Sequence, residues 1–143
     1  MTERFDELGG ATPRLRFSAF DFDRTPDGHC RARVVLAWAE GGEFVGQAEG
    51  VVSPAGELRC AAAAALEAIM QAAGKQAMFE LLGVKAVRAF DQTVVIVSVA
   101  ARDASRVLRL VGSHITEVNP PRGAALAVLN ATNRLMGNLL TTR

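Results

Sequence analysis

Two stretches of the chain are similar to each other: residues 45–70 read VGQAEGVVSPAGELRCAAAAALEAIM, and residues 111–136 read VGSHITEVNPPRGAALAVLNATNRLM. A shift of 66 residues gives seven identities, which pair Val45 with Val111, Gly46 with Gly112, Val52 with Val118, Pro54 with Pro120, Ala61 with Ala127, Ala65 with Ala131 and Met70 with Met136. Upstream of them the alignment needs a gap of about three residues. Because this period is too long for a solenoid repeat, it predicts two copies of one supersecondary unit.

Each copy contains the start of a helix. Ser53 and Asn119 can accept a hydrogen bond from an exposed helix amide, and each precedes a proline that fits the first helical position. Apolar residues then recur at helical spacing and predict one buried stripe per helix. The stripes are Leu58, Ala61, Ala62, Ala65, Leu66 and Ile69 in the first helix, which Gly74 should end, and Ala125, Val128, Leu129, Thr132, Leu135, Met136 and Leu139 in the second.

Three strands are predicted before each helix, because short apolar or alternating runs are separated by turn residues. Arg31 and Arg33, for example, alternate with apolar residues at the period of a half-buried strand. The stretch 79–82 is also compatible with a helical turn. The predicted strands are residues 15–22, 30–38 and 44–52 before the first helix, and 78–90, 94–100 and 107–118 before the second.

This order of elements predicts an α+β domain of two repeated βββα units, about residues 13–75 and 76–143, after a flexible lead-in at 1–12. Each unit has an antiparallel sheet with one helix across a face. Two units related by a pseudo-two-fold axis cover each other's apolar surfaces, and any apolar face left over favours a homodimer.

The composition excludes several classes of protein. The chain has 143 residues, 50% hydrophobic and 22% charged, which suits one domain with a core and is too apolar for a disordered segment. A net charge of +1 gives no reason to expect a nucleic-acid or membrane partner, and no apolar run has the length of a bilayer span. The polar first residues and the lone cysteines, Cys30 and Cys60, predict a cytoplasmic protein with two buried thiols.

Residue types that carry catalysis are scarce. The chain has two histidines, one tryptophan and no tyrosine, and neither His29 nor His114 has further ligands at metal-binding spacing. The serines do not occur in a Gly-x-Ser-x-Gly elbow, and no glycine-rich phosphate-binding loop is present. We therefore expect a non-catalytic protein that holds no metal and no cofactor.

The loops that enter the two helices are the candidate ligand-binding site. Helix N-termini offer N–H groups and a partial positive charge, which suit a small carboxylate, and concave sites gather where two halves meet. The same residues also serve simply to start helices, and this alternative stays open. The candidate residues are Gly50, Val51, Ser53, Pro54 and Ala55 in the first loop, and Thr116, Glu117, Asn119 and Pro120 in the second.

The second predicted helix resembles a known family. Residues 127–135 read AVLNATNRL, which is similar to the small-aromatic-Leu-Asn-Ala-x-Asn-Arg-Leu helix in the C-terminal regulatory domain of 2-isopropylmalate synthase and its citramalate synthase relatives. Residues 14–140 also resemble that domain in the order of their elements. The chain differs in having Val128 at the aromatic position, no acidic residue in register in loop 50–56, and EVNPP at 117–121 in place of an acidic Thr-Asp-Ile segment.

The resemblance implies a free-standing regulatory module that forms a homodimer. By the same resemblance, a small amino or keto acid binds between its halves, and a larger protein partner reads the change. The catalytic barrel of the synthases has no counterpart in this sequence, so the resemblance implies no condensing activity.

Two alternatives make use of the same fold. One is a structural dimerisation or protein-docking module without a ligand. The other is an RNA-binding platform on a sheet, which stacks bases on aromatic side chains. Strict alternation along the first strand places Phe17 on the opposite face from Phe20 and Phe22, so the three are not expected to form one stacking surface.

Overall fold

A computed structural model of the chain describes residues 15–74, 78–103, 106–133, 135 and 140–141. It is an α+β structure in which two three-stranded antiparallel sheets are each followed by a helix, consistent with two similar βββα units. The elements are β1 (Leu15–Arg24), β2 (His29–Trp38), β3 (Glu43–Val51), α1 (Pro54–Ala73), β4 (Met78–Ala89), β5 (Gln92–Asp103), β6 (Arg106–Thr116), α2 (Pro120–Thr132) and β7 (Leu140–Thr141).

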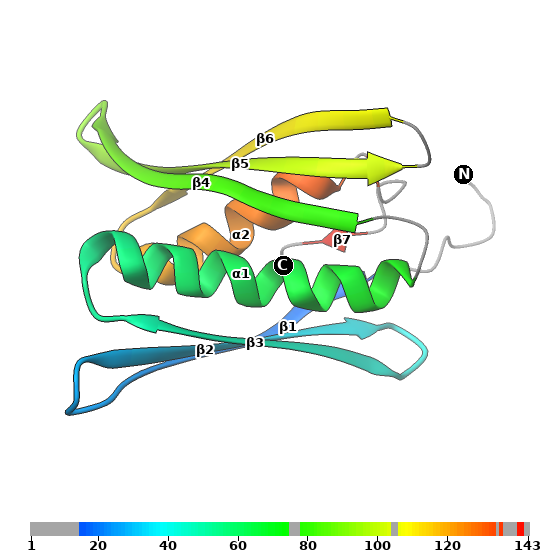
Figure 1. Cartoon of the computed structure of the whole chain (residues 1–143), viewed down its shortest axis with the longest axis horizontal. Helices are drawn as coiled ribbons and strands as arrows, with labels where there is room; N and C mark the ends of the chain where they lie inside the picture. Colours follow the sequence, from blue (N-terminus) through cyan, green and yellow to red (C-terminus); the bar gives the residue numbers. More distant parts are fainter. Residues whose placement is uncertain (1–14, 75–77, 104–105, 134, 136–139, 142–143) are drawn as a thin grey trace.

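The two helices lie side by side between the two sheets (Figure 1). The first sheet has the strand order β3-β2-β1-β7, and the second has the order β4-β5-β6. Helix α1 packs against β2 and β3, whereas α2 packs against β5 and β6. Each sheet therefore has an inner face toward the helices and an outer face that points away from them.

The ladders of the two sheets have matching irregularities. A β-bulge lies between Phe17 and Ala19 in β1, and another lies between Leu81 and Gly83 at the corresponding place in β4. The predicted three-residue gap lies between the second and third strands of the units. Arg33 pairs with Gln47, 14 residues further on, whereas Ile96 at the equivalent position pairs with Ser113, 17 residues further on. With these correspondences, each residue on the outer face of the first sheet has an equivalent residue on the outer face of the second sheet.

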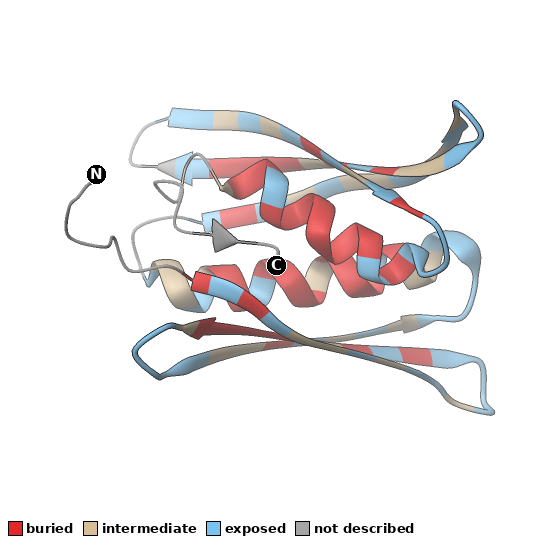
Figure 2. Cartoon of the chain, turned by 180° about the vertical axis from the view of Figure 1, so that it is seen from behind, coloured by how far each residue is buried: buried red, intermediate tan, exposed pale blue. Residues whose placement is uncertain are grey.

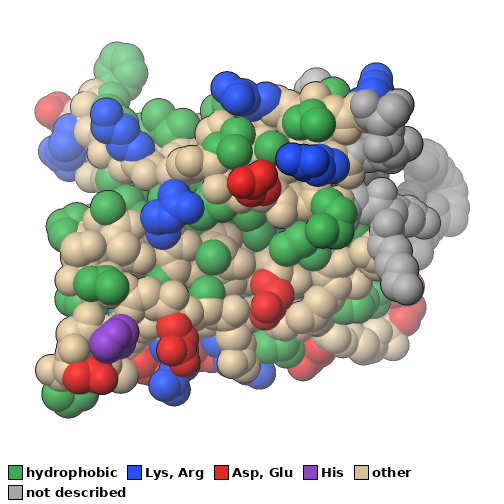
Figure 3. All heavy atoms as spheres, viewed as in Figure 1, with side chains coloured by type: hydrophobic (Ala, Val, Ile, Leu, Met, Phe, Trp, Pro, Cys, Tyr) green, Lys and Arg blue, Asp and Glu red, His purple; other side chains and the backbone are tan. Residues whose placement is uncertain are grey.

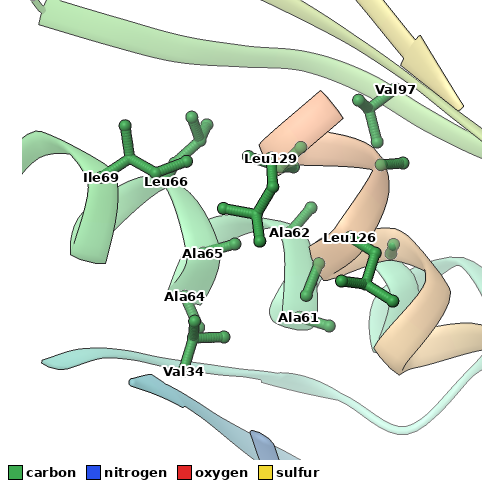
Figure 4. Packing of buried hydrophobic residues seen from close by; sticks show 14 of the residues in the cluster. Val34, Ala61, Ala62, Ala64, Ala65, Leu66, Ile69, Val97, Leu126 and Leu129 are labelled. Atoms are coloured by element: carbon green, nitrogen blue, oxygen red, sulfur yellow. The ribbon is translucent and has the colours of Figure 1, made fainter. Parts of the chain in front are cut away.

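Small residues let the helices approach each other closely. Helix α1 buries five alanines, among them Ala61, Ala62 and Ala65, which lie toward Leu126 and Leu129 of α2 (Figure 4). Buried residues are concentrated on the two helices and on the strand faces that meet them (Figure 2). The alanine-rich stripe predicted from the sequence is therefore confirmed as a helix contact.

Each helix also lies unusually close to one strand, where the chain has a glycine. A Cβ atom at Gly46 would be 2.0 Å from the carbonyl oxygen of Ala64, and one at Gly112 would be 2.3 Å from that of Ala127. Real Cβ atoms do not come this near to backbone oxygens. The paired glycines of the repeat are therefore explained by helix packing.

Asn130, within the AVLNATNRL stretch of the second helix, has a structural role in this contact. The side-chain Nδ2 of Asn130 donates a hydrogen bond of 2.7 Å to the carbonyl oxygen of Ser113 in β6. On α1, the side chain of Gln71 donates in the same manner to the carbonyl oxygen of Val45 in β3, at 2.8 Å. Both helices are thus tied to the free edge of the neighbouring strand.

Residues 79–82 are strand, which confirms the predicted strand 78–90 and excludes the helical turn; the bulge at Leu82 disturbs the alternation there. The structure corrects two details of the predicted elements. Helix α2 ends at Thr132, whose hydroxyl donates back to the carbonyl oxygen of Val128, so Leu135 follows the helix while Met136 and Leu139 lie outside the described residues. The short strand β7 was not predicted, and the expected lead-in at 1–12 lies outside the described residues.

The glycine contacts lead to a test of stability. We expect Gly46→Ala and Gly112→Ala each to lower the free energy of unfolding by about 1–3 kcal/mol or more, because the methyl group would overlap backbone atoms. Gly83→Ala is the matched control, since a Cβ there meets nothing within 4 Å. Urea denaturation measures all three, and equal effects of Gly46→Ala and Gly83→Ala would contradict this account of the packing.

The two cysteines are buried and unpaired, as predicted. Burial raises the pKa of the Cys60 thiol to about 12, with a further contribution from neighbouring Cys30. The reactive thiolate is therefore essentially absent at neutral pH. We expect the native protein to react with a thiol reagent only as slowly as it unfolds, and the denatured protein to yield two thiols at once. Rapid labelling of the native state would be the contrary result.

Candidate ligand-binding site

The two helix starts have the predicted caps. The N–H of Gly56 donates to Oγ of Ser53 at 2.9 Å, and the N–H of Arg122 donates to Oδ1 of Asn119 at 3.1 Å. Prolines occupy the first helical position in both. The cap assignments of Ser53 and Asn119, with Pro54 and Pro120, are confirmed.

These caps leave few N–H groups for a ligand. At the start of α2, Pro120 and Pro121 have no N–H, while those of Arg122 and Gly123 donate to the side chain and the carbonyl of Asn119. At the start of α1, Pro54 has no N–H and those of Gly56 and Glu57 donate to Ser53, which leaves the N–H of Ala55. The carboxylate-binding amides expected at Asn119 are therefore not available, because two prolines and the cap have removed them.

The remaining candidates of the two loops have different surroundings. Gly50 lies beside Cys30 and Cys60, and Val51 ends β3 with a side chain that is 61% exposed. Thr116 is buried, and its hydroxyl accepts a hydrogen bond from the N–H of Asn119 at 3.3 Å. Glu117 is exposed. Gly50 and Thr116 therefore shape the loops, whereas Val51 and Glu117 lie at the surface.

A groove of about 620 Å³ brings one of these candidates together with the other unit. Asn119 comes from the start of α2 in the second unit, and every other lining residue belongs to the sheet of the first unit. Sequence reasoning missed these residues because they are distant from the helix-entry loops along the chain. The groove is lined by Phe20, Asp21, Phe22, Asp23, Arg31, Ala32, Arg33, Gln47 and Asn119.

Charges of both signs line this groove. Arg33 Nη1 is 3.3 Å from a carboxylate oxygen of Asp21, and Arg31 Nε is 3.5 Å from one of Glu49. The side chains are largely exposed, so these ion pairs contribute little to stability and their groups can change partners. A small molecule with one carboxylate and one ammonium group would find an opposite charge for each.

The phenylalanines of β1 share one face, which corrects the prediction that Phe17 lies opposite Phe20 and Phe22. The bulge at Ser18 inserts one residue, so Phe17, Phe20 and Phe22 pair with Leu36, Val34 and Ala32 on the inner face. Their ring centroids are 6.4 Å apart for Phe17 and Phe20, and 6.3 Å for Phe20 and Phe22. Strict alternation fails here because a bulge has no reliable signature in the sequence.

A smaller recess of about 230 Å³ lies beside the β1–β2 turn, near the loop that enters α1. The N–H of Val52 donates to the carbonyl oxygen of Gly28, which joins that loop to the turn. Hydrogen bonds from Thr25 and His29 lower the pKa of the Asp27 carboxyl. Across the part of the chain that the structure describes, no group of three or more His, Cys, Asp or Glu side chains is arranged to hold a metal ion.

No protein-family model matches the chain, and no curated protein matches it. Among the described helices, none combines the length and the apolar character needed to cross a bilayer.

An ion pair joins the end of β1 to the start of α1 and leads to a pH test. Arg24 donates two hydrogen bonds to Glu57, of 2.9 and 2.7 Å, which lower the pKa of that carboxyl below its ordinary value of 4.5. A carboxyl with a lowered folded pKa stabilises the protein above its unfolded pKa, and this contribution disappears as the pH falls through the folded pKa.

We expect Glu57→Gln to lower the melting temperature modestly near pH 7, because Arg24 is largely exposed, and to lose this effect progressively below about pH 4.5. Thermal unfolding of both proteins across that pH range measures it. A difference that stays constant as the pH falls would show that the pair does not act through charge.

Proposed function

We propose that the chain is a non-catalytic regulatory module that senses a small amino acid in the groove that Asn119 of the second unit lines together with the sheet of the first unit. The single observation that carries the proposal is the lining of that groove, to which β1, β2 and β3 of one unit and Asn119 of the other contribute. A ligand that contacts both units favours one relative arrangement of them. A partner protein that distinguishes the arrangements would then respond to the ligand.

The groove favours an amino acid over a keto acid. The guanidinium groups of Arg31 and Arg33 supply partners for a carboxylate, in place of the helix amides that the prolines remove. Asp21 and Asp23 supply partners for an ammonium group, which a keto acid lacks. Phe20 and Phe22 also line the groove, although their rings pack on the inner face against the core.

The repeat supports a symmetrical origin for the module. We propose that the two βββα units are related by a pseudo-two-fold axis, as in the regulatory domain that the second helix resembles. The matching bulges in β1 and β4 support this relation. The two unpaired buried thiols, Cys30 and Cys60, support a reducing compartment such as the cytoplasm.

The RNA-binding alternative has less support. Although the phenylalanines of β1 do line up, they pack on the inner face against the core, whereas Arg31 and Arg33 are on the outer face. A base-stacking platform needs aromatic and basic side chains on the same accessible surface. The alternative of a structural or protein-docking module requires no ligand, and a ligand screen separates it from ours.

The test is a thermal-shift screen of amino acids and their matching 2-keto acids. A ligand at about a hundred times its dissociation constant stabilises the fold by about 2.7 kcal/mol, a shift of a few degrees. We expect a branched-chain amino acid to give this shift, its keto acid a smaller one, and Arg33→Gln to abolish both. Arg59→Gln, on the exposed side of α1, is the matched control and should respond like the wild type. A flat response to every compound would favour a structural module.

A further inference from the structure

The outer faces of the two sheets have opposite chemical character. On the first sheet, Asp23, Arg31 and Glu49 form one row across the three strands, and Asp21 and Arg33 begin the next. Arg31 is paired with Glu49 and Arg33 with Asp21. Such cross-strand ion pairs are typical of a face in contact with water.

The corresponding row on the second sheet is apolar. Val87, Val94 and Ile115 occupy the positions of Asp23, Arg31 and Glu49. Together with Ile96 and Val111 they form a surface that we call the outer apolar face. Ile115 and Val111 are 56% and 66% exposed, although most large apolar side chains of the chain are buried.

Nothing in the described part of the chain covers this face, because both helices lie on the inner side of the sheet (Figure 1). Seen from the side, the part of the molecule formed by this sheet carries basic side chains with hydrophobic ones among them (Figure 3). Exposing several large apolar side chains on one face is unfavourable in water and marks a contact surface.

We propose that a second copy of the chain covers the outer apolar face, sheet against sheet. The two-fold axis lies in the interface, perpendicular to the strands, below the row Gly83–Ser98–Val111. Packed sheets keep their strand directions within about 30° of each other, so rows near the axis stay in register. Val111 then meets the partner's Val111, and each row on one side of the axis meets the corresponding row on the other side.

The charges next to the axis are complementary in this arrangement. Lys85 lies one row beyond the central row on β4, and Glu80 lies one row before it, because of the bulge at Leu82. The axis therefore brings Lys85 opposite the partner's Glu80, and the pair occurs twice. Arg109 lies in the same row as Glu80 but on the edge strand β6, and Arg102 lies one row farther out, so a long side chain at either position reaches solvent.

The area is sufficient for a specific dimer. Strands of about 11 residues at about 3.3 Å each, three abreast at about 4.8 Å, give a face of about 500 Å² and an interface of about 1,000 Å² in total. Specific protein interfaces begin near this size. An isologous two-fold contact is also the commonest form of self-association.

This surface lies on the other sheet from the groove, so it deepens the proposed regulatory module without sharing its residues. It names the second copy as a partner of the module. The ligand response and the molar mass can therefore be measured on the same variants, and failure of one proposal leaves the other standing.

The test is light scattering combined with circular dichroism at micromolar concentration. We expect a wild-type mass about twice the 15.2 kDa of one chain, and a folded monomer for Val111→Glu. Lys85→Glu and Glu80→Lys should each weaken the dimer at least tenfold, and the double variant should restore it. Glu49→Gln, on the outer face of the first sheet and outside the groove, is the control and should remain dimeric.

A wild-type monomer at these concentrations would overturn the proposal. A dimer that persists in both Val111→Glu and Lys85→Glu would show that the copies meet elsewhere. Because Lys85 is exposed, its substitution leaves the core intact and keeps the test valid if Val111→Glu does not fold.

Discussion

The close approach of each helix to its sheet is the constraint on which the rest of the structure depends. Gly46 and Gly112 let helix backbones lie where a Cβ atom would otherwise be, and the alanines of α1 let α2 lie against it. Both helices consequently lie between the two sheets. The inner face of each sheet packs against them and forms the core. The outer faces and the edge of β1 are then what remains for contact with other molecules.

Apart from the short strand β7, the sequence was sufficient to predict the order of elements and the helix caps, because capping, turn chemistry and periodicity are local properties. The alignment of the two copies also predicted a gap of about three residues. The strand pairings of Gln47 and Ser113 confirm this gap. The bulge at Ser18 was not predictable, since one inserted residue reverses the facing of a whole strand without a distinctive residue type. The groove depends on the packing of the two units, which no local pattern encodes.

The helix starts show why a correct local prediction does not guarantee a site. Asn119 caps α2 as expected, yet the same Pro120 and Pro121 that favour the helix remove the donors a carboxylate would use. The arginines of β2, which line the same groove, offer the more suitable charge. The two similar units have thus diverged. The outer face of the first sheet is charged and contributes to the groove, whereas the outer face of the second sheet has an apolar row.

The measurement that tests the central claim most directly is an NMR titration of the isotope-labelled protein with a branched-chain amino acid. The account predicts saturable shifts of the backbone amides of Arg33 and Gln47 in the first unit together with Asn119 in the second, and little change at Arg59 on α1. Shifts confined to one unit, or none at millimolar ligand, would contradict a ligand site shared between the two units.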